Sequence, residues 1–245
     1  MSYAFQWIRS LIFIILMYLA MAVIGIGFAP WALFSRRGTY FAMHLYCRWV
    51  FWSAHRIINL KTEIRGTPPT DEVLLAAKHQ SFLDIIMIFG AVPRGKFIMK
   101  RSLIWAPFLG QYAKRIGCIF VDRGKRSGAI KKMVADVKSG AHEPGQLIIF
   151  PQGTRVAVGK EMPYKIGTGV LYKETGQECV PVATNVGVFW RRHGIYRDPG
   201  VAVIEFLPRI QSGLSVEEFM PTLKDSIETA SDRLAAEAGY KVSDK

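Results

Sequence analysis

The chain has 245 residues, of which 50% are hydrophobic, and its 32 basic and 19 acidic residues give a formal net charge of +13. This apolar content excludes an intrinsically disordered chain, and the lack of a fixed period excludes a repeat array. The length fits one large domain, or a domain with an appendage. Three widely spaced cysteines without a CxxC pair indicate neither a disulfide framework nor a zinc site, and they favour a reducing compartment.

The basic residues are concentrated in two segments. Residues 1–66 hold seven basic residues and one acidic residue, and residues 94–165 hold 15 basic and four acidic residues. Most basic residues lie on solvated surfaces, but a local excess of this size favours an anionic partner. Phosphate, acidic lipid and nucleic acid are the three candidates at this point.

A long uncharged run dominates the N-terminus. The 26 residues between Arg9 and Arg36 carry no charge, and about 20 apolar residues suffice to cross a bilayer core as a helix. Ala20–Ala22 resembles a signal-peptide cleavage site, but the apolar run continues past it to Phe34. The run is also too long and too uniformly apolar for a buried core helix, so we expect it to associate with a membrane.

The sequence leaves two forms open for this N-terminal arm. Two glycines and Pro30 interrupt the run, and a second apolar, aromatic-rich stretch follows at residues 39–60. The arm is either a spanning helix followed by an interfacial helix or a helical hairpin in one leaflet. Arg36 and Arg37 directly follow the first run, which predicts that the body of the protein lies on the cytoplasmic side.

From residue 62 the pattern becomes that of an α/β domain. We expect a single domain over residues 62–245, with a mixed β-sheet flanked by helices, preceded by the hydrophobic helical arm of residues 1–61. A capping box at Ser215 starts a C-terminal helical region that is interrupted or restarted near Pro221. The other predicted elements are strands at residues 72–78, 118–121, 146–150, 180–189 and 201–206, and helices at residues 81–89 and 128–138.

The first candidate site, His79-Gln-Ser-Phe-Leu-Asp84, follows the strand predicted at residues 72–78. Five residues on one helix turn through about 500°, so the pair can meet only if His79 lies in the loop and Asp84 in the first helical turn. Ser81 supports this placement because it can cap the helix. The pair then forms a dyad in which the carboxylate orients an imidazole base. Alternatively, Asp84 only complements the helix N-terminus.

Three further segments place polar residues at strand ends. Phe150-Pro-Gln-Gly-Thr-Arg155 offers a glycine for close backbone approach and a guanidinium suited to phosphate, although an ordinary turn with a surface arginine also fits. Gly117–Arg123 runs a strand into Asp122-Arg123, for which a structural salt bridge is the alternative. Val180–Val182 fits the plain start of a strand.

The four segments together, in this order, resemble the glycerolipid acyltransferase family, and in particular its bacterial 1-acyl-glycerol-3-phosphate acyltransferases. The family has N/K-H-x4-D, G-x-x-F-[IV]-D-R, F-P-E-G-T-R and V-P-[VI] blocks. They stand here as Lys78–Asp84, Gly117–Arg123, Phe150–Arg155 and Val180–Val182. The resemblance covers roughly residues 62–210. Any single block is weak, whereas four ordered blocks are highly specific.

The resemblance implies transfer of a fatty acyl group from a thioester to the sn-2 hydroxyl of 1-acyl-glycerol-3-phosphate, giving phosphatidic acid. His79 is then the general base and Asp84 its orienting partner, and no acyl-enzyme forms because the hydroxyl attacks the thioester directly. The arm attaches the enzyme to the inner, cytoplasmic membrane. The residues expected to bind substrate are Lys100, Arg123, Gln152, Gly153, Thr154 and Arg155.

The partners implied are the lysophospholipid, the acyl thioester and the bilayer. The donor is either acyl-CoA or an acyl carrier protein, and it is a co-substrate, so no cofactor is expected. Five scattered histidines give no cluster of metal ligands. Nothing in the sequence has the signature of a nucleic-acid-binding motif.

Gln152 departs from the family, which has glutamate at this position. If that glutamate acts through its charge, acceptor binding differs here, but if it only accepts a hydrogen bond, glutamine can substitute. Arg155 is retained, which favours a phosphorylated acceptor. Two other functions stay open: acyl transfer to another lysolipid, such as lyso-ornithine lipid, and a non-catalytic module that binds anionic lipid.

Overall fold

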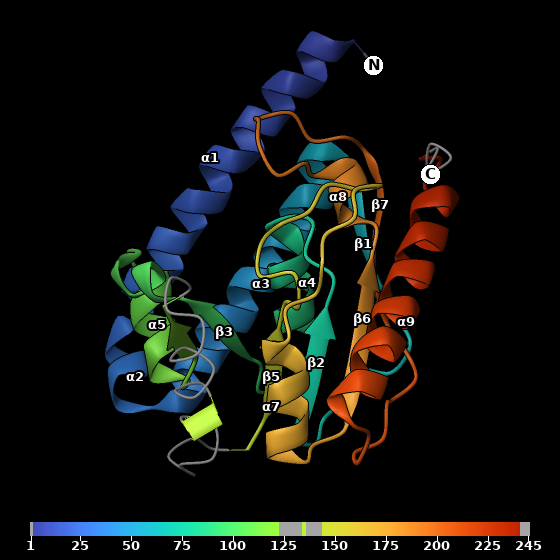
Figure 1. The fold of residues 1–245 in the computed structure, drawn as a ribbon. Helices are drawn as coiled ribbons and strands as arrows, with labels where there is room; N and C mark the ends of the chain where they lie inside the picture. Colours follow the sequence, from blue (N-terminus) through green and yellow to red (C-terminus); the bar gives the residue numbers. More distant parts are fainter. Residues whose placement is uncertain (1, 123–133, 136–143, 241–245) are drawn as a thin grey trace.

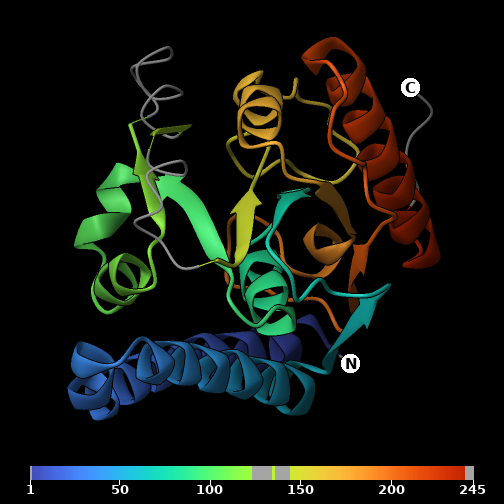
Figure 2. The same cartoon turned by 90° about the horizontal axis from the view of Figure 1, so that it is seen from below.

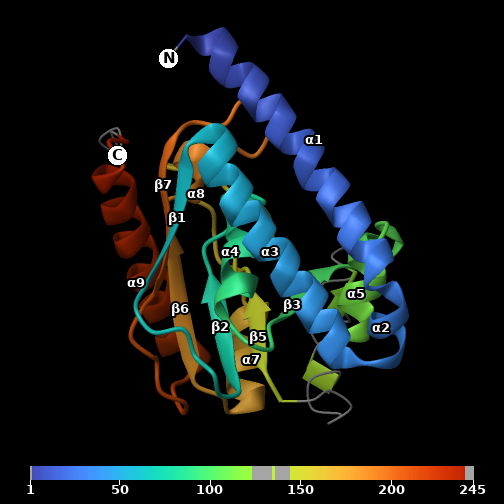
Figure 3. The same ribbon diagram turned by 180° about the vertical axis from the view of Figure 1, so that it is seen from behind.

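The computed structural model describes residues 2–122, 134–135 and 144–240 (Figure 1). The uncharged run forms most of one long helix and the short helix that follows it. Helix α1 (Tyr3–Gly27) is followed by the short helix α2 (Ala29–Phe34), which has a proline in its first turn, and by α3 (Arg36–Ile58). Helices α1 and α3 lie side by side and run in opposite directions, joined through α2 (Figures 2 and 3). The arm is therefore a helical hairpin.

The body contains a mixed, seven-stranded sheet in the order β1-β7-β6-β2-β5-β3-β4. All neighbouring strands are parallel except β6 and β7. The mixed sheet flanked by helices confirms the predicted fold class. Its strands are β1 (Leu60–Arg65), β2 (Val73–Ala77), β3 (Lys96–Lys100), β4 (Ile119–Val121), β5 (Gln146–Ile149), β6 (Cys179–Thr184) and β7 (Gly200–Phe206).

Helices cover both faces of this sheet, and the arm joins one of the layers. Figure 2 shows α4 (Leu83–Ala91) and the arm on one face, with α7 (Gly167–Thr175) and α9 (Val216–Glu237) on the other. Phe13 and Met17 of α1 are buried in the same hydrophobic core as α4 and the central strand β2. The remaining short helices are η1 (Arg101–Trp105), α5 (Leu109–Arg115) and α8 (Val186–Phe189).

Two predicted elements differ from the structure. The strand predicted over residues 180–189 ends at Thr184, and α8 follows it. The Asn185 side chain accepts a hydrogen bond from the Val203 amide (2.7 Å) and donates to the Leu234 carbonyl (3.2 Å), while Thr184 Oγ1 accepts from the Val186 amide (3.0 Å). These side-chain hydrogen bonds end the strand at Thr184. The prediction of a strand to residue 189, which was based on apolar composition, is therefore wrong.

The C-terminal helix also differs, because α9 runs without a break through Pro221. Proline removes the amide that would bond the carbonyl of Glu217, which is in the first turn and exposed to water. The capping box at Ser215 is confirmed. The helix predicted over residues 128–138 lies mostly outside the described residues, and the boundary between residues 61 and 62 stays a prediction.

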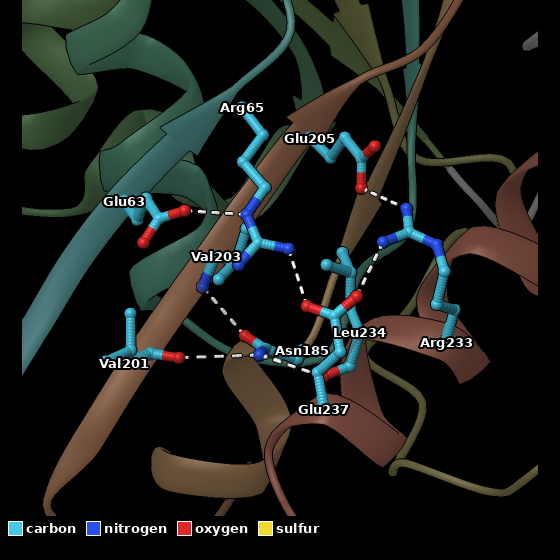
Figure 4. A network of polar contacts seen from close by, with 9 residues as sticks. All are labelled: Glu63, Arg65, Asn185, Val201, Val203, Glu205, Arg233, Leu234 and Glu237. Atoms are coloured by element: carbon cyan, nitrogen blue, oxygen red, sulfur yellow. Dashed lines mark hydrogen bonds and ion pairs between the residues drawn. The ribbon is translucent and has the colours of Figure 1, made fainter.

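Polar contacts fix α9 to the sheet (Figure 4). Arg65 of β1 lies between Glu63 and Glu237 of α9, with 2.6 Å to each carboxylate. Arg233 of α9 pairs with Glu205 of β7 and, at 2.7 Å, with Glu237. These ion pairs add to the buried apolar contacts of Phe219, Leu223 and Ile227, which pack α9 against the sheet.

Candidate active site

A histidine–aspartate pair lies directly beyond the C-terminal end of β2. His79 Nδ1 is 3.0 Å from Asp84 Oδ1, with His79 in the loop and Asp84 in the first turn of α4. The other Asp84 oxygen, Oδ2, accepts hydrogen bonds from the Gln80 and Ser81 amides, both at 2.7 Å. The Asp84 side chain is 0% exposed and that of His79 is 12% exposed. The structure thus has His79 in the loop and Asp84 in the first helical turn, as the five-residue spacing predicted.

The helix start differs in detail from the sequence prediction. Helix α4 begins at Leu83, and the cap position is Phe82, not Ser81. Ser81 donates its amide to Asp84 Oδ2, and its Oγ accepts a hydrogen bond from the Leu83 amide at the start of the helix (3.4 Å). The carboxylate therefore makes two kinds of contact: one oxygen accepts the amides that lead into the helix, and the other lies against the imidazole.

Packing holds the imidazole from the side. The His79 ring stacks on Phe150 with 4.0 Å between ring centroids and 19° between planes. The His79 carbonyl accepts a hydrogen bond from the Val156 amide (2.8 Å), which ties the loop after β2 to the loop after β5. The two loops lie together because β2 and β5 are neighbouring parallel strands, whose C-terminal ends share one edge of the sheet.

The loop after β5 contains the other predicted residues. Gly153 adopts a φ of +70°, a left-handed conformation that favours glycine, and the end of the flexible Lys165 side chain lies beside it. Arg155 Nη1 donates to the Arg192 carbonyl, and Arg192 Nη1 donates to the Arg155 carbonyl, both at 3.3 Å. Thr154 precedes this pair. The reciprocal bonds hold Arg155 against the segment after α8.

A cavity of about 710 Å³ opens beside the dyad. His79, Lys100, Thr154 and Arg155 contribute to its lining, so the structure brings these four predicted residues together. No acidic side chain among the described residues lines it. Most of the lining is apolar, from α1, α3, α4 and α5, and includes Met17, Met21, Met43, Ile86, Phe108 and Leu109.

Arg197 is a cation of this cavity that sequence reasoning missed. It is 7% exposed, and its guanidinium lies over the Trp190 ring at 4.5 Å. Nη1 donates to the Gly194 and Tyr196 carbonyls, whereas Nε is buried without a hydrogen-bond partner in the described part of the chain. Burial lowers the pKa of Arg197 to about 10, partly opposed by Tyr18. Arg197 lies in a loop and belongs to none of the four sequence blocks, so the sequence did not identify it as a candidate site residue.

Other predicted residues are not part of this lining. Gln152 is buried beneath the loop, where it donates a hydrogen bond to Glu228, and neither Gln152 nor Gly153 lines the cavity. Arg123 lies outside the described residues, so its predicted contact with substrate stays a prediction. Within residues 2–122, 134–135 and 144–240, no group of three or more His, Cys, Asp or Glu side chains is placed to hold a metal ion.

The arrangement supports general base chemistry on a long apolar substrate with an anionic end. A carboxylate-bound imidazole can take a proton from a hydroxyl. Lys100, Arg155 and Arg197 bring positive charge to the cavity, and its apolar part offers burial for hydrocarbon.

Comparison with known proteins gives one family and several relatives. The Acyltransferase family model matches residues 59–185. The chain is 26% identical to a 1-acyl-sn-glycerol-3-phosphate acyltransferase of Pseudomonas aeruginosa, covering 84% of this chain and 82% of that protein. It is 27% identical to 1-acyl-sn-glycerol-3-phosphate acyltransferase alpha of Mus musculus, covering 71% of this chain and 63% of that protein.

The comparison with solved structures finds the same fold in an acyltransferase from Thermotoga maritima. The crystal structure of the 1-acyl-sn-glycerophosphate (LPA) acyltransferase from Thermotoga maritima superposes with a TM-score of 0.79 at 21% identity. The match covers 94% of this chain and 98% of that one. The shared fold includes the N-terminal arm, because only a small fraction of either chain lies outside the match.

Proposed function

The chain belongs to the acyltransferase family, and we propose that it transfers a fatty acyl group from a thioester to the sn-2 hydroxyl of 1-acyl-glycerol-3-phosphate, which gives phosphatidic acid. The observation that carries this proposal is the His79–Asp84 pair at 3.0 Å, which opens on a cavity with basic and apolar parts. The names of the relatives support the choice of acceptor.

The proposed reaction needs one base and no covalent enzyme intermediate. With Nδ1 bonded to Asp84, the free Nε2 of His79 takes the proton of the acceptor hydroxyl as its oxygen attacks the thioester carbonyl. The tetrahedral intermediate collapses, the carbon–sulfur bond breaks, and the leaving thiolate takes the proton from the imidazolium. Asp84 stabilises the imidazolium between these steps. The acyl group thus moves from sulfur to oxygen, and protons balance.

The basic and apolar parts of the cavity indicate where the phosphate and the acyl chain of the acceptor bind. We assign its phosphate to Arg155, whose planar guanidinium can make paired bonds to phosphate oxygens, with Lys100 as a second cation. Thr154 adds a hydroxyl beside Arg155. The acyl chains take the apolar part of the cavity, where burial contributes about 0.8 kcal/mol per methylene. No cofactor enters this scheme.

The contacts of α1 favour the hairpin in one leaflet over a spanning helix. Gln6 Nε2 donates to the Ile58 and Arg197 carbonyls, and the Tyr112 hydroxyl donates to the Gly25 carbonyl at 2.8 Å. A helix bonded to the body near both ends lies along the body, even though its length and composition would allow it to cross a membrane. We propose that the arm is embedded in the cytoplasmic leaflet of the inner membrane.

An apolar stripe on α1 supports this placement. Phe34 at the end of α2 is 87% exposed, and Arg36 and Arg37 follow it after one serine. Apolar side chains then enter the leaflet while arginines stay at the headgroups. The exposed members of the stripe on α1 follow helical spacing: Ile8, Ile12, Ile15, Leu19, Val23 and Ile26.

The test is an acyl-transfer assay of the purified protein that pairs each acceptor with each donor. Lysophosphatidate and lyso-ornithine lipid are offered with acyl-CoA and with acylated carrier protein. We expect phosphatidate from lysophosphatidate, and either donor is compatible with the dyad. Transfer only to lyso-ornithine lipid would assign the other acceptor. Vesicle binding without any transfer would identify a non-catalytic lipid-binding module.

A further inference from the structure

The carboxylate of Glu228, on α9, lies at the centre of a buried polar cluster behind the active-site loop. It accepts hydrogen bonds from Lys78 Nζ, from the Tyr164 hydroxyl (2.8 Å) and from Gln152 Nε2 (3.4 Å). Glu228 is 19% exposed and Lys78 is 4% exposed. Burial beside this carboxylate also raises the pKa of Tyr164. Glu228 lies beyond residues 59–185, the part that the family model matches.

This cluster reaches the base from both of the loops that form the site. Lys78 immediately precedes His79, and its own amide donates to Val182 of β6 at 2.9 Å. Gln152 is fully enclosed, and its Oε1 is 3.5 Å from the His79 amide, which points to it. Glu228 therefore fixes the residue before His79 by an ion pair and, through one glutamine, the amide of His79 itself.

The ion pair explains why a carboxylate is needed here. A lysine ammonium that is withdrawn from water needs a nearby negative charge, and removing that charge leaves it uncompensated. Glu228 is the carboxylate that pairs with Lys78 in the described structure. Without it, Lys78 gains by moving toward solvent, and that movement displaces the adjoining backbone of His79.

The same geometry explains glutamine at position 152. Its amide uses both ends: the oxygen faces the His79 amide, and the nitrogen donates to Glu228. A glutamate at this position has no donor for Glu228 and would set two carboxylates about 3.4 Å apart. One of them would then have to bind a proton. In this chain the negative charge of the cluster is on residue 228, and position 152 is neutral.

We propose that Glu228 is a positioning residue for the acyl transfer, and that it determines the requirement for glutamine at position 152. This inference rests on the proposed function, since Glu228 acts through His79 and touches neither substrate. Its effect is on the placement of the base, so it acts on kcat and leaves the KM for the acceptor near its wild-type value.

A charge-exchange series tests the proposal. Glu228→Gln, Gln152→Glu and the double variant are compared with wild type, and Glu217→Gln provides an exposed glutamate on the same helix as the matched control. We expect each single change to lower kcat about a hundredfold, the scale of a small displacement of a catalytic group. The double variant restores one carboxylate and one amide, so its kcat returns to within about tenfold of wild type. Glu217→Gln leaves kcat unchanged.

Two further readouts separate positioning from simple stability. For Gln152→Glu, the ratio of its kcat to that of wild type rises as the pH is lowered, because a shared proton removes the repulsion. Melting temperatures of all variants are recorded in parallel. Single variants that melt lower but keep their kcat, or a double variant whose loss equals the product of the single losses, would overturn the proposal. A wild-type protein without turnover refutes the proposed function and, with it, this inference.

Discussion

Replacing Asp84 by asparagine should change which nitrogen of the His79 imidazole carries the proton, while a side chain of the same size still fills the position. Asp84 Oδ2 accepts hydrogen bonds from two backbone amides. In the asparagine variant the side-chain oxygen takes this position, because the side-chain nitrogen, which is itself a donor, cannot accept from two amides. The asparagine nitrogen then faces His79 Nδ1, 3.0 Å away in the wild type. Nδ1 becomes an acceptor, Nε2 carries the hydrogen, and the base is lost.

The size of the effect follows from this tautomer exchange. The corresponding change in a serine protease lowers kcat about 10⁴-fold, which is roughly 5 kcal/mol of transition-state stabilisation. The folded state loses little, because the asparagine makes the same number of hydrogen bonds. We expect the free energy of unfolding to change by less than about 2 kcal/mol. Activity and stability are thereby separated in one variant.

The assay follows thiol release from the acyl donor in the presence of lysophosphatidate, together with urea unfolding of the same preparation. We expect a fall of about four orders of magnitude in kcat with near-wild-type unfolding. An Asp84→Asn protein that keeps more than about a tenth of the wild-type kcat would refute the view that Asp84 orients the base. Ser81→Ala is the control, because it keeps the backbone amide that donates to Asp84 and removes the hydroxyl that accepts from the Leu83 amide. Its kcat should stay near the wild-type value.

Three other predictions concern the acceptor, the core and the pH. Arg155→Lys keeps the charge but loses the planar fork, so the KM for lysophosphatidate rises about tenfold while kcat changes little in the same assay. Asn185→Ala removes the side-chain acceptor of the buried Val203 amide and one donor to the Leu234 carbonyl, and it lowers the free energy of unfolding, measured in urea, by about 2–3 kcal/mol. Arg65 and Arg233 lower the pKa of Glu237 through hydrogen bonds to its carboxylate. The contribution of Glu237 to folding stability is therefore present above the ordinary glutamate pKa and is lost as the pH falls through the lowered value. In Glu237→Gln, the melting temperature should accordingly fall less steeply as the pH is lowered.

The residues of the sequence blocks could be predicted to lie together, because the strands that precede them are neighbours in the sheet. His79 and Arg155 follow parallel strands, and parallel neighbours bring the residues after them to the same edge. The His79–Asp84 contact needed only a loop residue and a first-turn residue, and the spacing allowed no other arrangement. These are local rules, so they can be read from the chain.

The supporting residues could not be predicted, because their contacts join distant segments. Lys78 and Glu228 are 150 positions apart, and the Gln6 contact with Arg197 spans 191. No periodicity or turn pattern encodes such pairs. Asn185 shows the same limit for secondary structure: its bonds to two other segments end a strand that local apolar composition extends to residue 189.

The proposed role of His79 as the base of acyl transfer to lysophosphatidate can be tested by measuring phosphatidate formation by purified wild-type and His79→Ala proteins on the same vesicles, with vesicle binding measured alongside. We expect phosphatidate to form with the wild type and to fall by at least about a thousandfold with the alanine variant, while both proteins bind the vesicles equally. Comparable phosphatidate formation by the two proteins would contradict this role of His79.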